Sequence, residues 1–139
     1  LINKTILFMI KFFTKYKIIF YSSNFILILL YLFPGSLIGC FLYNDCKLQP
    51  QITRDYIISS NHLYGFAILS LIGFLTYKNS KKIRYLGGYL IAISIFLEIF
   101  HYFIPERSFE YSDLFGNLAG VIIVIIVFNL LKIYENSKN

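Results

Sequence analysis

The chain has 139 residues, a formal net charge of +6 and a hydrophobic fraction of 58%, with a mean hydropathy of +0.67. A single domain of this length cannot cover so much apolar surface in water, so we expect lipid to be its solvent and its fold class to be an all-α membrane protein. The positive residues stand in short blocks between apolar runs, which is typical of membrane topology signals and argues against nucleic acid as a partner.

Residues 1–17 are basic and amphipathic. On a helical wheel, Lys4, Lys11 and Lys15 fall within roughly 40° of one another, while apolar side chains fill the remaining positions. No small-residue cleavage site follows, so we do not interpret the segment as a signal peptide. Two interpretations stay open: a short helix lying in the inner headgroup plane, or the basic flank of the first membrane span.

The first predicted span covers residues 18–33, and Pro34-Gly35 marks its end. Residues 35–56 then form a long outer-surface segment, which could fold over the outer mouth of a helix bundle. Cys40 and Cys46 both lie in this segment. They could form a small-loop disulfide if the outside is oxidising, and Cys40 could equally be a buried apolar residue.

Three further spans are predicted, at about residues 57–77, 85–104 and 113–131. Each is an apolar run that is long enough, or nearly long enough, to cross the hydrocarbon core of a bilayer. Pro105 ends the third span, and a polar turn leads from it to the fourth. Residues 134–139 are predicted to be a polar cytoplasmic tail.

Together the four spans predict a four-helix transmembrane bundle over residues 18–133. Its orientation follows from lysine and arginine, because cytoplasmic loops carry an excess of these residues. If the N-terminus lies in the cytoplasm, ten of the thirteen lie on the inner side, and the outer side holds Lys47, Arg54 and Arg107. We therefore expect a multi-pass protein with both termini in the cytoplasm.

Polar side chains gather in the outer half of this predicted bundle. A charged group at membrane depth costs roughly 2.5–3.5 kcal/mol on insertion scales, so such groups are usually placed for a reason. Glu98 lies about seven residues, or roughly 10 Å, below the outer end of its span. Neighbouring spans bring other polar residues to a similar depth. The predicted functional cluster consists of His62, Glu98, His101, Arg107, Asp113 and Asn117.

Structural roles remain open for several members of this cluster. Asp113 could cap the fourth helix, and Asn117 could be an interhelical hydrogen-bonding group. Arg107 could pair with a nearby glutamate in water. Glu98 is the hardest to explain in this way, because a carboxylate at that depth needs a partner or a water-filled cavity.

Two small residues on the fourth span, Gly116 and Gly120, are four positions apart. This spacing lets another backbone approach the polar face of that helix, so we predict that both glycines are helix-packing residues.

A metal site is one alternative for the cluster. Glu98-x-x-His101 together with His62 would supply one carboxylate and two imidazoles, which zinc or iron accepts. E-x-x-H is a weak pattern and no further helix repeats it, so we expect neither a metal nor another cofactor.

Hydrolysis with Glu98 as the base and His101 as its orienting group is chemically feasible. The chain lacks a Ser or Cys nucleophile with a recognisable local signature, and an enzyme is not favoured.

The sequence resembles the VanZ-like family of small bacterial membrane proteins. The resemblance is carried by E-x-x-H at 98–101, P-x-R-S-F at 105–109 and D-x-x-x-N-x-x-G at 113–120, with SSNHLYGFAILSLIGF at 59–74 in support. It covers about residues 20–132. It implies a four-helix domain in the bacterial cytoplasmic (inner) membrane, with polar residues toward the outer face.

The motif positions of this family correspond to His62, Glu98, Arg107, Asp113, Asn117 and Gly120. The chain departs from the commoner pattern at His101, where the family more often has Gln, and at Val124, where a further Gly is often found. The namesake of the family is associated with low-level resistance to the glycopeptide teicoplanin. The resemblance therefore implies architecture more directly than activity.

We rank three functions on these features. In the first, the protein binds or modulates an envelope lipid, glycan or peptidoglycan precursor in an outer polar cavity, with Arg107 on an anionic group. Exposed aromatic residues such as Tyr102, Phe109 and Tyr111 would stack on a sugar or anchor at the interface. The second is a membrane-embedded enzyme acting on a lipid-linked substrate, with Glu98 as acid/base. The third is a small transporter or assembly subunit, which would need to form a homo-oligomer.

Overall fold

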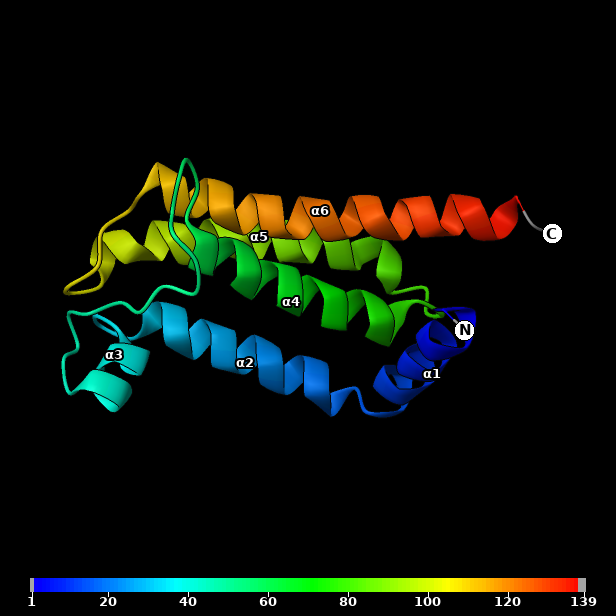
Figure 1. The fold of residues 1–139 in the computed structure, drawn as a ribbon, viewed down its shortest axis with the longest axis horizontal. Helices are drawn as coiled ribbons and strands as arrows, with labels where there is room; N and C mark the ends of the chain where they lie inside the picture. The colour runs from blue at the N-terminus through cyan, green and yellow to red at the C-terminus, as the bar shows by residue number, and fades with distance from the viewer. Residues whose placement is uncertain (1, 138–139) are drawn as a thin grey trace.

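The structure, a computed structural model, describes residues 2–137 and is all-helical over that part of the chain (Figure 1). The apolar runs of the sequence form the long helices, and the polar runs between them form turns. The elements in order are α1 (Ile2–Lys15), α2 (Ile18–Leu32), α3 (Leu37–Tyr43), α4 (Ser60–Tyr77), α5 (Ile83–Phe100), the 3₁₀ turn η1 (His101–Phe103) and α6 (Tyr111–Asn136).

The four long helices α2, α4, α5 and α6 lie alongside one another, and α4 is central (Figure 1). Helix α4 packs against α1, α2, α5 and α6. Helix α1 lies at the same end of the molecule as the α4–α5 connection and the C-terminus (Figure 1). The short helix α3 and the α5–α6 connection lie at the opposite end. This second end holds the predicted polar cluster.

Two helical segments in the described part of the chain are long and apolar enough to cross a membrane: α5 with η1 (Ile83–Phe103), and α6 (Tyr111–Asn136). A third would be the pair α1 and α2, which are bent by 77° at their break. Two or three of the four predicted spans thus meet this test of length and composition. Helix α4 falls short of it, because the polar residues of its first turn, Ser60 to His62, lower its hydropathy.

The outward faces of the long helices are apolar. On α6, Ile122, Ile126 and Leu130 are 46%, 51% and 59% exposed, and on α5 Phe96 and Phe100 are similarly exposed. Soluble monomers rarely expose contiguous apolar patches of this kind. These faces indicate a membrane protein whose outer surface contacts lipid.

Helix α6 extends beyond the predicted fourth span into the predicted tail. The predicted tail, residues 134–139, is helical as far as Asn136, and Lys138 and Asn139 lie outside the described residues. No glycine or proline interrupts the sequence after Leu131, so nothing stops the helix at the edge of its apolar run. The Nζ of Lys78 lies 2.9 Å from Glu135 and ties this last stretch to the α4–α5 connection.

Helix α3 was not predicted from the sequence. Its N-terminus is capped by Ser36, whose side chain accepts a hydrogen bond from the Gly39 N–H at 3.0 Å. Asn44 ends it in the left-handed conformation, and a disulfide joins Cys40 to Cys46. Seven residues give too little apolar periodicity to identify a helix, so local caps and a crosslink define this one.

The two predicted packing glycines bring α6 close to α4. A Cβ atom on Gly116 would lie 2.6 Å from the Ser59 carbonyl oxygen, and one on Gly120 would lie 2.8 Å from the Ala67 nitrogen and overlap the Leu63 carbonyl oxygen. Because neither glycine has a Cβ, the α4 and α6 backbones can come this close. Both glycines therefore lie where the backbones of α4 and α6 approach each other closely.

We expect Gly120→Ala to lower the stability of the protein by about 1–3 kcal/mol, because the new methyl group overlaps α4 backbone atoms that cannot move away cheaply. The matched control is Gly88→Ala, whose Cβ would meet nothing within 4 Å. That change should leave stability unchanged or raise it by about 0.5–1 kcal/mol. Thermal unfolding in detergent measures both, and equal shifts would contradict the close α4–α6 packing.

Candidate functional site

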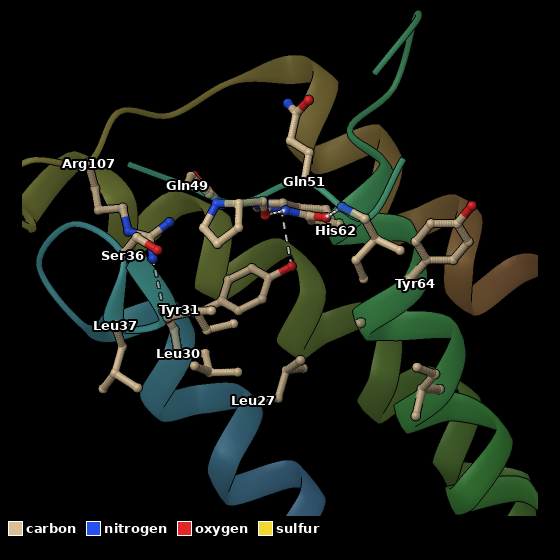
Figure 2. Close-up of a pocket in the computed structure, with 16 residues that line it drawn as sticks. Leu27, Leu30, Tyr31, Ser36, Leu37, Gln49, Gln51, His62, Tyr64 and Arg107 are labelled. Atoms are coloured by element: carbon tan, nitrogen blue, oxygen red, sulfur yellow. Dashed lines mark hydrogen bonds between the residues drawn. The ribbon is translucent and has the colours of Figure 1, made fainter. Parts of the chain in front are cut away.

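Tyr31 lies at the centre of a buried network that joins three helices. It sits in the last turn of α2 and is 8% exposed. Its hydroxyl donates to Asn117 Oδ1 on α6 and lies 3.0 Å from His62 Nδ1 on α4. Figure 2 shows the Tyr31 hydroxyl directed toward His62. One phenol therefore ties α2 to both α4 and α6.

The imidazole of His62 meets oxygen atoms on both sides. Its Nδ1 lies 3.1 Å from Asn117 Oδ1, and its Nε2 lies 3.4 Å from Asp113 Oδ2. The Asn117 amide is oriented by its own Nδ2, which donates to the Ser94 carbonyl at 3.3 Å. Because an amide oxygen can only accept, this network assigns a proton to Nδ1 of His62 and leaves Nε2 facing the Asp113 carboxyl group.

Glu98, on α5, is completely buried. Its Oε1 accepts from the Glu110 N–H at 3.1 Å and lies 3.3 Å from His101 Nδ1. The other nitrogen of His101, Nε2, lies 3.2 Å from the Tyr31 carbonyl oxygen and donates to it. His101 therefore joins the Tyr31 backbone on α2 to the Glu98 carboxyl group on α5.

The second oxygen of Glu98 is different. Oε2 is buried and has no hydrogen-bond partner among residues 2–137. It lies 3.8 Å from His62 Nδ1. Glu98 thus uses one oxygen to hold the turn before α6 and directs the other toward His62.

Arg107 lies in the turn between η1 and α6, outside the long helices. Its guanidinium donates to the Leu30 carbonyl at 2.9 Å and to the Phe33 carbonyl at 3.3 Å. It therefore satisfies free carbonyl groups at the C-terminal end of α2, where a positive charge is favourable. Burial lowers the pKa of the Arg107 guanidinium from its ordinary value, while Tyr31 and the nearby carboxyl groups oppose that shift.

Asp113 does not cap α6, so that interpretation of the sequence is wrong. The helix begins at Tyr111 and its N-cap residue is Glu110, which places Asp113 inside the first turn. A carboxylate there is favoured by the N-terminal end of the helix dipole. From this position Asp113 faces His62 across the α4–α6 contact.

A cavity of about 330 Å³ lies beside the network, between α2, the segment around α3, and α4 (Figure 2). One wall is apolar and includes Leu27, Leu30 and Ile68. The polar part of the lining includes Tyr31, Ser36, Gln49, Gln51, Asn61, His62 and Arg107. The cavity therefore reaches the buried network at His62 and Tyr31.

The structure places the predicted residues in two groups. His62, Glu98, His101, Asp113 and Asn117 form one connected buried cluster. The second group is Arg107 alone. Its hydrogen bonds go to backbone carbonyls of α2 rather than to the two carboxylates, and its side chain lines the cavity together with His62.

Sequence reasoning missed Tyr31. A tyrosine near the end of an apolar run is usually an interfacial residue, so its position gave no signal of a buried role. A buried tyrosine hydroxyl nevertheless needs a hydrogen-bond partner. That requirement would have pointed to the cluster only if the burial of Tyr31 had been known.

No protein-family model, curated protein or solved structure matches this chain. The resemblance to the VanZ-like family therefore stays a prediction from sequence motifs. The geometry of the buried cluster and of the cavity beside it carries the functional interpretation.

We expect Tyr31→Phe to destabilise the protein by about 1–3 kcal/mol, because it removes the hydroxyl that joins His62 to Asn117 and leaves buried polar atoms less well satisfied. Tyr64→Phe is the matched control. The Tyr64 hydroxyl lies 3.3 Å from the exposed Thr53 hydroxyl, so its loss should change stability by less than about 0.5 kcal/mol. Thermal unfolding measures the difference, and a neutral Tyr31→Phe would show that the network does not depend on this hydroxyl.

Proposed function

We propose that this chain is an integral membrane protein of the bacterial cell envelope that binds an amphiphilic envelope component in the cavity between α2, α3 and α4. The observation that carries the proposal is the composition of the cavity lining, which has an apolar wall and a polar end containing Arg107, His62 and Tyr31. The volume of about 330 Å³ falls within the range of small-molecule sites.

The apolar wall suits a hydrocarbon chain, since Leu27, Leu30 and Ile68 offer no hydrogen bonds. The polar end suits an anionic headgroup. A guanidinium has five N–H donors, and two atoms of Arg107 already donate to α2 carbonyls, which holds the group in place and leaves further donors for a phosphate or carboxylate. A lipid-linked glycan or peptidoglycan precursor has both parts.

The proposed topology has four spans, with α2, α4, α5 and α6 crossing the bilayer as a VanZ-like domain. Helix α4 crosses inside the bundle, where its polar first turn is sheltered by its neighbours. Helix α1, turned by 77° from α2, lies in the inner interface. The positive-inside rule then puts both termini in the cytoplasm and the cavity at the outer side.

A catalytic role is the second candidate, and one contact favours His62 for it. His62 lines the cavity, and its Nε2, which carries no assigned proton, lies 3.4 Å from the Asp113 carboxyl group, so the two side chains form an acid–base pair beside the cavity. Glu98, proposed from the sequence as the acid/base, does not line the cavity. An enzyme acting on a lipid-linked substrate would therefore use His62.

We expect the purified protein to bind a polyprenyl phosphate in detergent, as measured by native mass spectrometry, in preference to zwitterionic phosphatidylcholine. Arg107→Gln should weaken that binding by roughly tenfold or more, because a hydrogen bond to a charged group contributes about 1.5–3 kcal/mol. Arg54→Gln is the matched control. Arg54 is exposed at the same end of the molecule and does not line the cavity.

A second pair of variants tests the location of the ligand. Ile68→Trp places a large side chain in the cavity wall, whereas Ile122→Trp adds the same side chain to the exposed face of α6. Ile68→Trp should abolish binding and Ile122→Trp should not. Equal binding by both would show that the polyprenyl phosphate sits on the lipid-facing surface rather than in the cavity.

The resemblance to the VanZ-like family extends the proposal to glycopeptide resistance. In a susceptible bacterial host, we expect the wild-type chain to raise the teicoplanin concentration needed to stop growth. Arg107→Ala should lose this effect and Arg54→Ala should keep it, at equal protein levels on an immunoblot. If the wild-type chain does not change susceptibility, the glycopeptide role is refuted. The binding proposal is then tested by native mass spectrometry alone.

A further inference from the structure

We propose that His62, Glu98 and Asp113 form a binding site for a divalent transition-metal ion such as Zn²⁺. One ligand atom from each residue lies within 4.8 Å of the other two. The three side chains come from α4, α5 and α6, so the site forms only when these helices pack together. The set differs from the His62, Glu98 and His101 set suggested by E-x-x-H, because Asp113 takes the place of His101.

The unpartnered oxygen of Glu98 is the observation that points to a ligand. Glu98 is completely buried, and its Oε2 has no hydrogen-bond partner in the described part of the chain. That oxygen lies 3.8 Å from His62 Nδ1 and within 4.8 Å of the ligand atoms that His62 and Asp113 offer. A buried carboxylate oxygen without a partner loses the hydration it had in water, and a metal ion at this position would compensate for that loss.

The charge of the cluster supports the same assignment. Two carboxyl groups, Glu98 and Asp113, meet around one imidazole, and the positively charged Arg107 directs its hydrogen bonds to α2 carbonyls instead. A divalent cation would neutralise both carboxylates at once. The attraction between the cation and the carboxylates is far stronger in a buried site of low dielectric constant than in water.

The donor atoms suit zinc and its neighbours in the first transition row, which accept imidazole nitrogen together with carboxylate oxygen. Ligands at about 2.0–2.2 Å from zinc stand roughly 3–3.5 Å apart in a tetrahedral site. The His62–Asp113 pair at 3.4 Å already has this spacing. Glu98 Oε2 lies within 4.8 Å of the ligand atoms of His62 and Asp113, so it needs to approach by up to roughly 1.5 Å to reach the tetrahedral spacing.

Groups around the three ligands hold them in place. His101 Nδ1 and the Glu110 N–H both contact Glu98 Oε1, which leaves Oε2 to face the site. Asn117 Oδ1 lies 3.1 Å from His62 Nδ1, so an imidazole that ligates through Nε2 keeps its proton on Nδ1 and donates it to the Asn117 amide oxygen. Such second contacts fix the orientation of metal ligands in known sites.

An ion can reach this position from the polar side of the molecule. His62 lines the cavity, and the Asp113 side chain is 19% exposed. The remaining coordination positions would be filled by water or by a polar group of a molecule bound in the cavity. The metal site itself does not depend on the proposed envelope ligand.

The test uses the full chain purified in detergent, stripped with a chelator and then titrated with ZnCl₂. Elemental analysis after gel filtration should give roughly one zinc per chain. His62→Gln, Glu98→Gln and Asp113→Asn should each lose stoichiometric zinc. Glu110→Gln is the matched acidic control: its exposed side chain is outside the ligand set, so it should bind zinc as the wild type does.

His101→Gln separates the two ligand sets. It should retain about one zinc per chain, with affinity lowered by at most roughly 10- to 100-fold, because His101 orients Glu98 without touching the metal. Loss of stoichiometric zinc in His101→Gln would favour the set suggested by E-x-x-H and overturn this one. Substoichiometric zinc in the wild type, or unchanged zinc in His62→Gln, would also overturn it.

X-ray absorption of the zinc-loaded wild type keeps the proposal testable if the variants do not fold. The spectrum should show nitrogen and oxygen ligands with scattering from one imidazole. Two imidazoles, or none, would refute the assignment. Because zinc binding and polyprenyl phosphate binding are measured separately, either can fail while the other succeeds, so failure of the metal site is distinguishable from failure of the proposed function.

Discussion

Glu98 imposes the constraint on which the polar end of this protein depends. A carboxyl group with no exposed surface must find its partners inside the molecule, and no single helix can supply them. One oxygen is held by His101 and by the backbone before α6, and the other faces His62 on α4. The cost of burying this group therefore fixes how α4, α5 and the start of α6 meet.

Close packing of α4 against α6 makes that meeting geometrically feasible. Gly116 and Gly120 allow the two backbones to approach, and the approach brings His62 within reach of Asp113 and Asn117. The same contact explains why α4 can carry a polar first turn. Ser60 and Asn61 form hydrogen bonds with the loop before α4, and His62 faces α6, whereas the exposed faces of α5 and α6 are apolar.

Tyr31 and His62 connect the buried cluster to the cavity. Both residues line the cavity and both belong to the hydrogen-bond network, so a molecule bound in the cavity would contact the network without entering it. Arg107 completes the polar end while anchored on α2. Under the proposed function this arrangement separates two roles: the cavity surface would select a ligand, and the buried carboxyl groups behind it would balance charge.

The sequence by itself determined the features that local pattern controls. Apolar runs fixed the long helices, Pro34-Gly35 marked the end of α2, and the four-residue spacing of Gly116 and Gly120 indicated close packing. Helical periodicity also placed Glu98 and His101 on one face, because residues three apart always share a face. These properties depend on neighbours within one or two turns, so they can be predicted without a tertiary structure.

Only the tertiary structure decided which distant groups meet. Tyr31 and Asn117 are far apart in the sequence, and their contact depends on how α2 and α6 rotate about their axes. The same rotations place Asp113 rather than His101 opposite Glu98 across His62, and they direct Arg107 to the end of α2. The rotation of each helix depends on many packing contacts with residues that are distant in the sequence. It therefore cannot be predicted from any single segment.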